Sequence, residues 1–320
     1  SEVIACGNGT DALQIAFMAL GLEPGDEVIT TPFTFVATAE VLALLGLKPV
    51  FADVDPGDFN LSPALAEAAI TSRTRALLPV HLFGQNAHME EFMTLAGKHG
   101  LHVVEDAAQS LGADYIFSNG ERRQSGTLGI IGCTSFFPSK TLGAFGDGGA
   151  LFTCDADMAV RIRSIANHGQ RVRYHYERIG MNSRLDSLQA AILDVKLRHL
   201  DEYVEARQKA AAWYDHHLQG VGDLLLPERR PWSTHSFHQY TLRTSRRDDL
   251  QSFLKEHGVP SMVYYPKPLH LHEAYHYLGY GPGDFPVSEN LTRTVLSLPM
   301  HTELDAQQLE HITETVKRFF

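Results

Sequence analysis

One lysine in this sequence stands where a free amine would be costly. Lys140 follows the apolar stretch CTSFF and precedes a cluster of glycines. A buried ammonium group is unfavourable unless it is paired or chemically transformed. A desolvated lysine amine can instead form a Schiff base with an aldehyde. Lys140 is therefore a candidate for covalent chemistry, and the alternative is a surface lysine at the end of a strand.

A glycine-rich turn near the start of the chain could bind a phosphate. The stretch CGNGTDA (6–12) follows an expected strand and opens an expected helix, where backbone N–H groups and the helix dipole attract anions. Gly7, Gly9 and Ala12 also match the dinucleotide pattern G-x-G-x-x-G/A. That pattern needs an acidic residue after the second strand, which here ends in Thr30 and Thr31. Phosphate binding is favoured, while an oxidoreductase with a nucleotide cofactor and a turn without any ligand remain alternatives.

An aspartate completes a set of three groups. Asp106 ends the stretch VVED (103–106), and a carboxylate at the carboxyl end of a parallel strand faces the ligand crevice, although a helix N-cap is the alternative role. Ser135, five residues before Lys140, could donate to a phosphate. An anion site, a carboxylate for a cationic ring nitrogen and a Schiff-base lysine are what pyridoxal phosphate requires.

The order of strands and helices supports the placement of these three groups at the ends of parallel strands. Short apolar strands alternate with helical patterns through the first 165 residues, which predicts an α/β fold with a mostly parallel sheet. The expected strands are 3–6, 27–30, 49–54, 75–80, 101–106, 131–137 and 149–153. Residues 185–218 contain no Gly or Pro and predict one long helix, which would join a large domain (1–200) to a smaller α+β domain (201–320). The polar segment 118–126 is expected to form a surface hairpin or loop.

The bulk composition excludes several classes of protein. A formal charge of -11 argues against a nucleic-acid partner, and no stretch is long and apolar enough to span a membrane. The three cysteines (Cys6, Cys133 and Cys154) lack C-x-x-C spacing, which favours a reducing, cytoplasmic compartment.

One rival motif points to a metal. HEAYH (272–276) fits the zinc pattern H-E-x-x-H, with Glu289 or Glu303 as a third ligand. The prolines just before it favour a loop, and we expect no metal there.

Six stretches, taken together, resemble the DegT/StrS-type sugar aminotransferases. They are GNGTDALQIAFMALGLEPGDEVITTPFTFVATAEVL, VEDAAQSLGA, TSFFPSK, GDGGALFT, GMNSRLDSLQAAIL and LSLPMHTEL, and they extend over nearly the whole chain. The resemblance implies the aspartate-aminotransferase fold (fold type I), with a seven-stranded, mostly parallel sheet and pyridoxal phosphate as cofactor. It also implies a homodimer with shared active sites. Relatives usually carry a helical segment ahead of the strand that begins here at Glu2, and this sequence departs from them in that respect.

The resemblance also implies a role for each matching residue. Lys140 would carry the cofactor and shuttle the proton, and Asp106 would pair with the pyridine nitrogen. Gln109 and Phe35 would lie against the ring, and Gly9, Thr10 and Ser135 would hold the phosphate. Asn182 would reach the phosphate in the neighbouring subunit, and Arg184 would bind a sugar carboxylate. Tyr264 and Tyr265 would contact the substrate; because relatives usually have His-Tyr-Pro where this chain has Tyr264-Tyr265-Pro266, this difference bears on the sugar rather than on the reaction.

The implied activity is transfer of an amino group from L-glutamate to a nucleotide-linked keto sugar, in surface polysaccharide (lipopolysaccharide or O-antigen) biosynthesis. Within this family, the six stretches most resemble those of enzymes that act on UDP-2-acetamido-2-deoxy-3-keto-glucuronic acid. A dTDP- or UDP-linked 3-keto or 4-keto-6-deoxyhexose is the alternative substrate. A non-catalytic pyridoxal-phosphate protein with a regulatory role is a more distant alternative.

Overall fold

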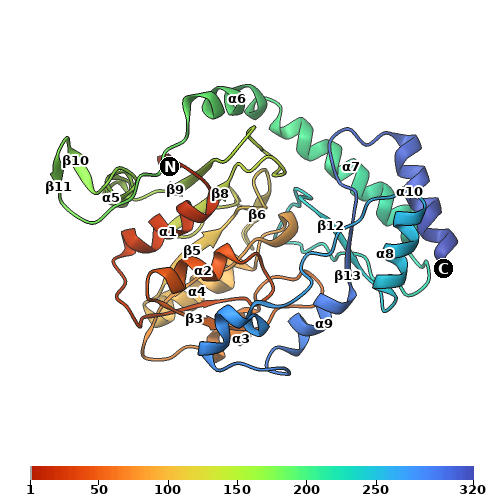
Figure 1. Ribbon diagram of the computed structural model, residues 1–320, viewed down its shortest axis with the longest axis horizontal. Coiled ribbons are helices and arrows are strands. Elements are labelled where there is room, and N and C mark those ends of the chain that lie inside the picture. The colour runs from red at the N-terminus through yellow and green to blue at the C-terminus, as the bar shows by residue number, and fades with distance from the viewer. Residues whose placement is uncertain (1) are drawn as a thin grey trace.

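The computed structural model describes residues 2–320, and its centre is a seven-stranded sheet of order β1-β9-β8-β5-β4-β2-β3 (Figure 1). The strands are β1 (Glu2–Cys6), β2 (Glu27–Thr30), β3 (Lys48–Phe51), β4 (Thr74–Leu77), β5 (His102–Asp106), β8 (Ile131–Ser135) and β9 (Gly149–Thr153). Only β9 runs against its neighbours, β1 and β8, while the other pairs are parallel. The predicted mostly parallel sheet is confirmed.

Helices cover both faces of the sheet because neighbouring strand residues point to opposite sides. Val28, Ala76 and Val104 lie in one core cluster, and the adjacent Ile29, Leu77 and Val103 lie in another. The first cluster packs against α1 (Gly9–Leu20), α2 (Ala37–Leu44) and α5 (Ala156–Ala166). The second packs against α3 (Pro63–Ala68) and α4 (Met89–His99). This double cover excludes water from the sheet that carries the candidate site.

Two hairpins leave the central sheet. The polar segment forms β6 (Asp114–Ile116) and β7 (Arg122–Gln124), as predicted. A second hairpin, β10 (Gln170–Val172) and β11 (His175–Tyr176), projects from the end of the molecule beside α5 (Figure 1). It carries the exposed side chains of Val172, Tyr174 and Tyr176.

The prediction of one helix over 185–218 is wrong in one respect. The structure has α6 (Ser187–Leu197) and α7 (Leu200–Leu218), with a break at Arg198 and His199. At the break the N–H of His199 donates to the carbonyl of Lys196, an i→i−3 bond that tightens the turn. Residues on both sides of the break, Leu193 and Leu200, then pack into the same apolar cluster around Leu142. This packing is tertiary, so no Gly or Pro marks the break in the sequence.

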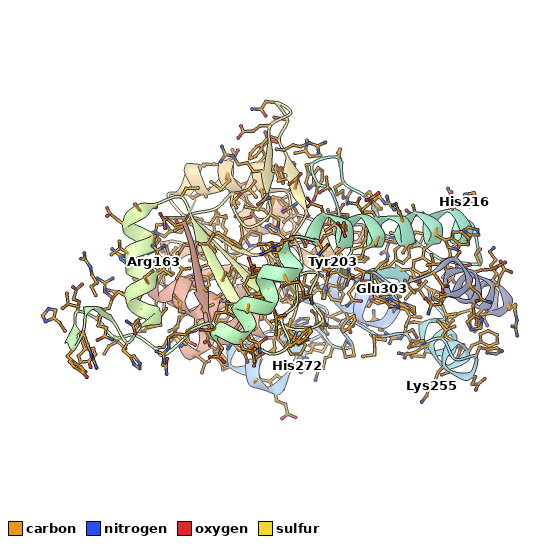
Figure 2. The ribbon with its side chains drawn as sticks, turned by 90° about the horizontal axis from the view of Figure 1, so that it is seen from above. Arg163, Tyr203, His216, Lys255, His272 and Glu303 are labelled. Atoms are coloured by element: carbon orange, nitrogen blue, oxygen red, sulfur yellow. The ribbon has the colours of Figure 1, made fainter. Side chains whose placement is uncertain are left out.

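The C-terminal part of the chain has a core of its own. Strands β12 (Tyr240–Arg243) and β13 (Val295–Leu298) pair antiparallel, and α7, α8 (Arg247–Glu256) and α10 (Ala306–Phe319) pack with them around Tyr214 and Leu250. Figure 2 shows α7 running from the central sheet, near Tyr203, out to this region, near His216. The remaining elements are η1 (Leu82–Gly84), η2 (Leu269–Leu271), η3 (Glu273–Leu278) and α9 (Pro286–Thr294). The domain boundary at residue 200 stays a prediction.

Within residues 2–320, none of the helices has both the length and the apolar character that crossing a bilayer would require.

Candidate active site

The candidate residues gather where the central strands end. Asp106 is the last residue of β5 and Ser135 the last of β8, and these two strands are parallel neighbours with Asp106 opposite Cys133. Lys140 lies five residues beyond Ser135, in a turn in which its N–H donates to the carbonyl of Phe137. Carboxyl ends of adjacent parallel strands share one edge of a sheet, which is where ligands bind in open α/β folds.

The N-terminus of α1 closes one end of this edge. Asn8 is the N-cap and accepts from the N–H of Asp11, while Gly9 and Thr10 begin the first turn. A Cβ on Gly9 would lie 2.7 Å from the Cβ of Ser135, and one on Gly149 would lie 2.5 Å from the Asn8 carbonyl carbon. The helix opening therefore lies against Ser135 at a distance that only glycine permits. N–H groups of a first helical turn have no partner within the helix, so they are available to a phosphate.

Asp106 is a buried carboxylate with few donors. Its Oδ2 accepts from the hydroxyl of Thr38 at 2.8 Å and its Oδ1 from the N–H of Ala108 at 3.2 Å. Burial raises the pKa of Asp106, and the bonds from Thr38 and Ala108 together with the charge of Lys140 oppose that rise. A carboxylate in this state gains from a cation placed beside it.

Lys140 is the complementary group. Burial lowers the pKa of the Lys140 amine, and the nearby charge of Asp106 acts in the opposite direction. The net lowering makes the neutral, nucleophilic amine easier to reach near neutral pH. Lys140 and Asp106 thus lie at the same end of the sheet, and the charge of each acts on the pKa of the other.

Aromatic and amide groups line the same region. Gln109 accepts from the N–H of Phe83 through Oε1 and donates to the hydroxyl of Tyr265 through Nε2, at 2.8 and 3.0 Å. Phe35 is 54% exposed and its ring lies 6.5 Å from that of Tyr265. Tyr265 is therefore tied to Gln109, and Tyr264 packs beside it. A direct contact of Gln109 and Phe35 with a cofactor ring, and of the two tyrosines with substrate, stays a prediction.

Two predicted residues lie apart from this group. Asn182 and Arg184 are exposed, and neither makes a contact with Lys140 or Asp106 in the described residues. Ser183 between them is buried, accepts from the N–H of Gly7 and donates to Asp11, so it fixes this segment on the start of α1. The exposed flanking side chains suit a role toward a second subunit, which stays a prediction.

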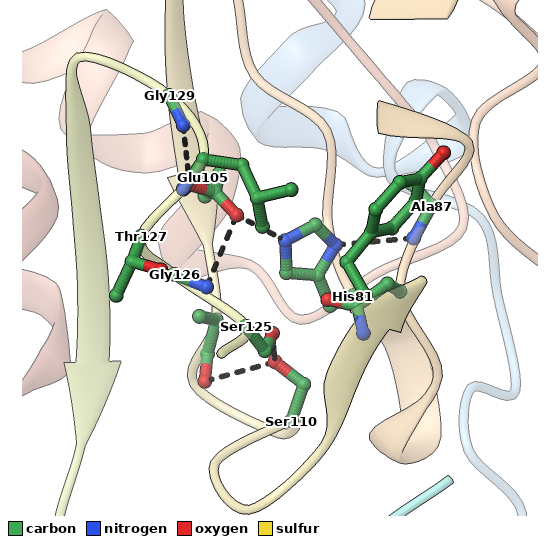
Figure 3. A network of polar contacts seen from close by, with 12 residues as sticks. His81, Ala87, Glu105, Ser110, Ser125, Gly126, Thr127 and Gly129 are labelled. Atoms are coloured by element: carbon green, nitrogen blue, oxygen red, sulfur yellow. Dashed lines mark hydrogen bonds and ion pairs between the residues drawn. The ribbon is translucent and has the colours of Figure 1, made fainter. Parts of the chain in front are cut away.

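Three residues near Asp106 were not singled out from the sequence as site residues. Thr38 donates to the Asp106 carboxylate, and the preceding residue on the strand, Glu105, forms a fully buried pair with His81 (Figure 3). The N–H of Ala87 donates to Nδ1 of His81, so the ring proton is on Nε2, which donates to Glu105 at 2.8 Å. Glu105 also accepts from the N–H groups of Gly126, Leu128 and Gly129. The sequence signal for Glu105 was the doublet Glu-Asp in VVED. Because adjacent side chains on a strand face opposite ways, Glu105 must lie on the other face of the sheet from Asp106 and needs partners of its own there.

This network predicts a large effect on stability. Glu105→Ala leaves four donors without their acceptor, and we expect a loss of at least about 3 kcal/mol in the free energy of unfolding by urea. The control is Glu205→Ala, an exposed i,i+4 partner of Lys209, which should leave the urea midpoint essentially unchanged because solvent screens an exposed ion pair. Equal losses in the two variants would contradict the importance of the Glu105 network.

The contact between Gly9 and Ser135 predicts an effect on ligand binding. Gly9→Ala forces the start of α1 away from Ser135, and we expect phosphate-bearing ligands to bind about 10- to 100-fold more weakly. Titration of pyridoxal phosphate, followed by absorbance, measures this. Gly97→Ala on α4 is the matched control, because a Cβ there meets nothing within 4 Å. Unchanged affinity in Gly9→Ala would contradict the assigned phosphate site.

The two rival motifs are placed differently. HEAYH forms part of the 3-10 helix η3, with His272 at its N-cap, instead of the α-helix that the zinc pattern needs. Glu289 contacts His270 at 3.2 Å, and Glu303 contacts its neighbour Thr302. Over residues 2–320 no cluster of three or more His, Cys, Asp or Glu side chains could hold a metal ion.

The second rival motif is the dinucleotide pattern. Its residues Gly7, Gly9 and Ala12 form the predicted strand-to-helix turn.

The residues present fit pyridoxal phosphate: a helix N-terminus with a hydroxyl, a buried carboxylate and a partly buried lysine. A mostly parallel sheet with these groups at one edge defines the class of fold type I pyridoxal-phosphate enzymes. The profile of the DegT/DnrJ/EryC1/StrS aminotransferase family matches residues 1–317. The chain belongs to this family and is an aminotransferase, as the sequence motifs predicted.

Three relatives resemble the chain over nearly its whole length. A protein of Geobacillus stearothermophilus named "Pleiotropic regulatory protein" is 50% identical, over 99% of this chain and 84% of its own. The UDP-2-acetamido-2-deoxy-3-oxo-D-glucuronate aminotransferase of Pseudomonas aeruginosa is also 50% identical, over 97% and 84%. The UDP-N-acetyl-3-dehydro-alpha-D-glucosamine 3-aminotransferase of Acidithiobacillus ferrooxidans is 46% identical, over 98% and 83%.

Solved structures share the fold. A DegT DnrJ EryC1 StrS aminotransferase from Brucella abortus superposes with a TM-score of 0.94 at 43% identity, covering 100% of this chain and 86% of its own. The protein ntda of Bacillus subtilis, solved with the bound cofactor pmp, gives a TM-score of 0.91 at 30% identity, covering 100% and 73%. The predicted aminotransferase fold is confirmed.

Proposed function

We propose that this aminotransferase moves an amino group from L-glutamate to UDP-2-acetamido-2-deoxy-3-keto-glucuronic acid, in surface polysaccharide biosynthesis. The observation that carries the reaction type is the partly buried amine of Lys140 and the buried carboxylate of Asp106 at the sheet edge where Ser135 meets the N-terminus of α1. The cofactor prediction, pyridoxal phosphate, is confirmed by the family and by the solved relative that holds its amine form. This cofactor supplies an aldehyde and an electron-accepting ring.

Each residue near the sheet edge then has a task. The N–H groups of Gly9 and Thr10 and the Ser135 hydroxyl would bind the phosphate, and Asp106 would keep the ring nitrogen protonated. Thr38 and Ala108 fix the orientation of the Asp106 carboxylate through hydrogen bonds. The Lys140 amine would hold the cofactor through its aldehyde, and as a free base it would take and return the proton.

The choice of sugar rests on two arguments. The relative from Pseudomonas aeruginosa, named for the 3-oxo-glucuronate, is 50% identical over nearly the whole chain. Arg184 offers a guanidinium for a carboxylate, which it can bind with two parallel hydrogen bonds. Because Arg184 is exposed and contacts neither Lys140 nor Asp106 in the described residues, we propose that it serves the site of a second subunit in a homodimer. Asn182 would reach the phosphate in the same way. A cytoplasmic location is part of this proposal.

The test of the substrate is a comparison of acceptors. The enzyme is loaded with pyridoxamine phosphate, and the return to the aldehyde form is followed by absorbance. We expect the UDP-linked 3-keto uronate to react faster than its uncharged 3-keto glucosamine analogue and than a dTDP-linked 4-keto-6-deoxyhexose. Arg184→Met should remove the preference for the uronate over the uncharged analogue. A preference for the uncharged or the deoxy sugar in the unaltered enzyme would overturn the proposed substrate.

A second candidate is a regulatory protein without turnover, which the name of the Geobacillus relative suggests. Such a protein would bind the cofactor and show its colour, yet L-glutamate would not convert it to the amine form. A half-reaction with L-glutamate decides between the two.

A further inference from the structure

A tight turn that follows β4 is held in a strained backbone conformation. In η1, Phe83 has a φ of +57°, in the left-handed region that bulky side chains avoid, and Gly84 follows with a φ of +112°. Such a conformation persists only where surrounding contacts enforce it. The turn lies beside the edge of the sheet that carries the candidate site, because the N–H of His81, just before it, donates to the carbonyl of Asp106 at 3.0 Å.

One buried asparagine holds the turn at both ends. Asn60 is 2% exposed; its Oδ1 accepts from the N–H of Leu82 at 2.9 Å, and its Nδ2 donates to the carbonyl of Gln85 at 3.2 Å. These two bonds need an acceptor at one end of the turn and a donor at the other, which a carboxamide supplies and a carboxylate does not. Backbone N–H groups of residues 236–239 hold the opposite side of the turn.

The turn sets the orientation of a predicted site residue. The N–H of Phe83 donates to Oε1 of Gln109 at 2.8 Å. Because its oxygen is engaged in this way, the Gln109 carboxamide directs its Nε2 to the hydroxyl of Tyr265, 3.0 Å away. A carboxamide nitrogen can only donate, so the Tyr265 oxygen is the acceptor in this pair. Gln109 itself lies three residues beyond Asp106, in the turn that follows β5.

Tyr265 is left with a proton to donate. Its oxygen accepts from Gln109, and its own O–H has no acceptor among the residues that the structure describes. Burial raises the pKa of the Tyr265 phenol, so the hydroxyl keeps its proton at neutral pH. The side chain is half-buried, and its ring lies 6.1 Å from that of Phe33 and 6.5 Å from that of Phe35. The hydroxyl is therefore a donor available to an oxygen of a bound ligand.

We propose that Asn60 is a positioning residue for the active site. By holding both ends of the turn, it keeps the Phe83 N–H on Gln109, and the resulting orientation of Gln109 leaves the Tyr265 proton free for an oxygen acceptor in the bound ligand. If the Gln109 carboxamide turned over, its oxygen would take that proton and the ligand would lose a donor. This inference rests on the proposed function, in which the acceptor is the ring hydroxyl of the cofactor or an oxygen of the keto sugar.

The first test needs no cofactor. Amide hydrogen exchange of the full chain, read residue by residue, should show the N–H groups of Leu82 and Phe83 protected, and Asn60→Ala should speed their exchange by at least about 10-fold. Asn86→Ala is the matched control, because Asn86 is also buried but its side chain donates to Ser233 and not to the turn. It should leave both rates within about twofold. Unprotected amides in the unaltered protein, or equal changes in the two variants, would overturn the role of Asn60.

A double-mutant cycle then shows whether Asn60 acts through Tyr265. Pyridoxal phosphate is titrated into the full chain by absorbance, and the KM for the UDP-linked 3-keto uronate is measured in the loaded enzyme. Asn60→Ala and Tyr265→Phe should each raise one of these constants about fivefold, which is what one hydrogen bond contributes. With Tyr265→Phe already present, Asn60→Ala should add less than about twofold. A raised dissociation constant identifies the cofactor as the source of the acceptor, and a raised KM identifies the sugar.

The outcomes separate this inference from the proposed function. If borohydride fails to link the cofactor to Lys140 in the unaltered enzyme, the proposed role of Lys140 fails, while the exchange of Leu82 and Phe83 still reports on Asn60. If the link forms but the losses in Asn60→Ala and Tyr265→Phe multiply, or neither constant changes, the role of Asn60 is overturned. If Asn60→Ala does not fold, Asn60→Ser takes its place in both tests, since a serine hydroxyl can replace at most one of the two bonds.

Discussion

Replacing Lys140 with alanine should leave the protein folded and able to bind pyridoxal phosphate, yet lower turnover by at least about 1000-fold. The side chain is partly buried but makes no side-chain hydrogen bond in the described residues, so its truncation removes little packing. The rate of the half-reaction with L-glutamate and the midpoint of urea unfolding measure the two effects. Lys209→Ala, at an exposed lysine on α7, is the matched control and should alter neither.

The pH dependence of this step follows from the same burial. Since burial lowers the pKa of the Lys140 amine, the active neutral form should persist to lower pH than for an ordinary lysine. The half-reaction should slow as the pH falls through that lowered pKa, because protonation removes the base. Turnover retained in Lys140→Ala would exclude the proposed role, whatever the pH profile.

Asp106→Asn should reduce turnover by about 100- to 1000-fold, with little loss of stability. Asparagine has the shape of aspartate, and its oxygen can still accept from Ala108 while its amide can donate to Thr38. What disappears is the negative charge that would keep the ring nitrogen protonated. The absorbance of the bound cofactor and the rate of the half-reaction report this loss.

The same substitution also acts on the lysine. The charge of Asp106 raises the pKa of Lys140 against the effect of burial, so Asp106→Asn should lower that pKa further. Thr38→Val is the comparison, because it removes one hydrogen bond and keeps the charge; we expect it to cost less than about tenfold in rate. A similar loss of rate in both variants would show that orientation, and not charge, is what Asp106 supplies.

The sequence was sufficient for the parts of the fold that depend on local chemistry. The turn at Gly7 and Gly9, the strand that ends in Asp106 and the position of Lys140 follow from residue type and spacing, and the structure confirms their placement. Alternation of strands with helix-length segments along the chain was likewise enough to predict a mostly parallel sheet covered on both faces. Motif resemblance added the family, which the comparisons confirm.

Other features depend on groups far apart in the chain. Thr38 reaches Asp106 across 68 positions, and the Arg207 guanidinium meets the carbonyl of Phe237 across 30. The break between α6 and α7 arises because Leu193 and Leu200 share one apolar cluster, which no local pattern signals. Contacts of this kind become visible only when the folded chain brings the partners together.

The hairpin of β6 and β7 offers a practical attachment point for a probe. Its base is rigid, because Gly126, Leu128 and Gly129 must keep their backbone donors aimed at Glu105. Its tip is different: Gly120 has a φ of +85° and open space around it. A fluorophore or affinity tag inserted there would extend into solvent on the far side of the hairpin from that anchored base. Immobilised or labelled enzyme made in this way should therefore keep its catalytic centre undisturbed.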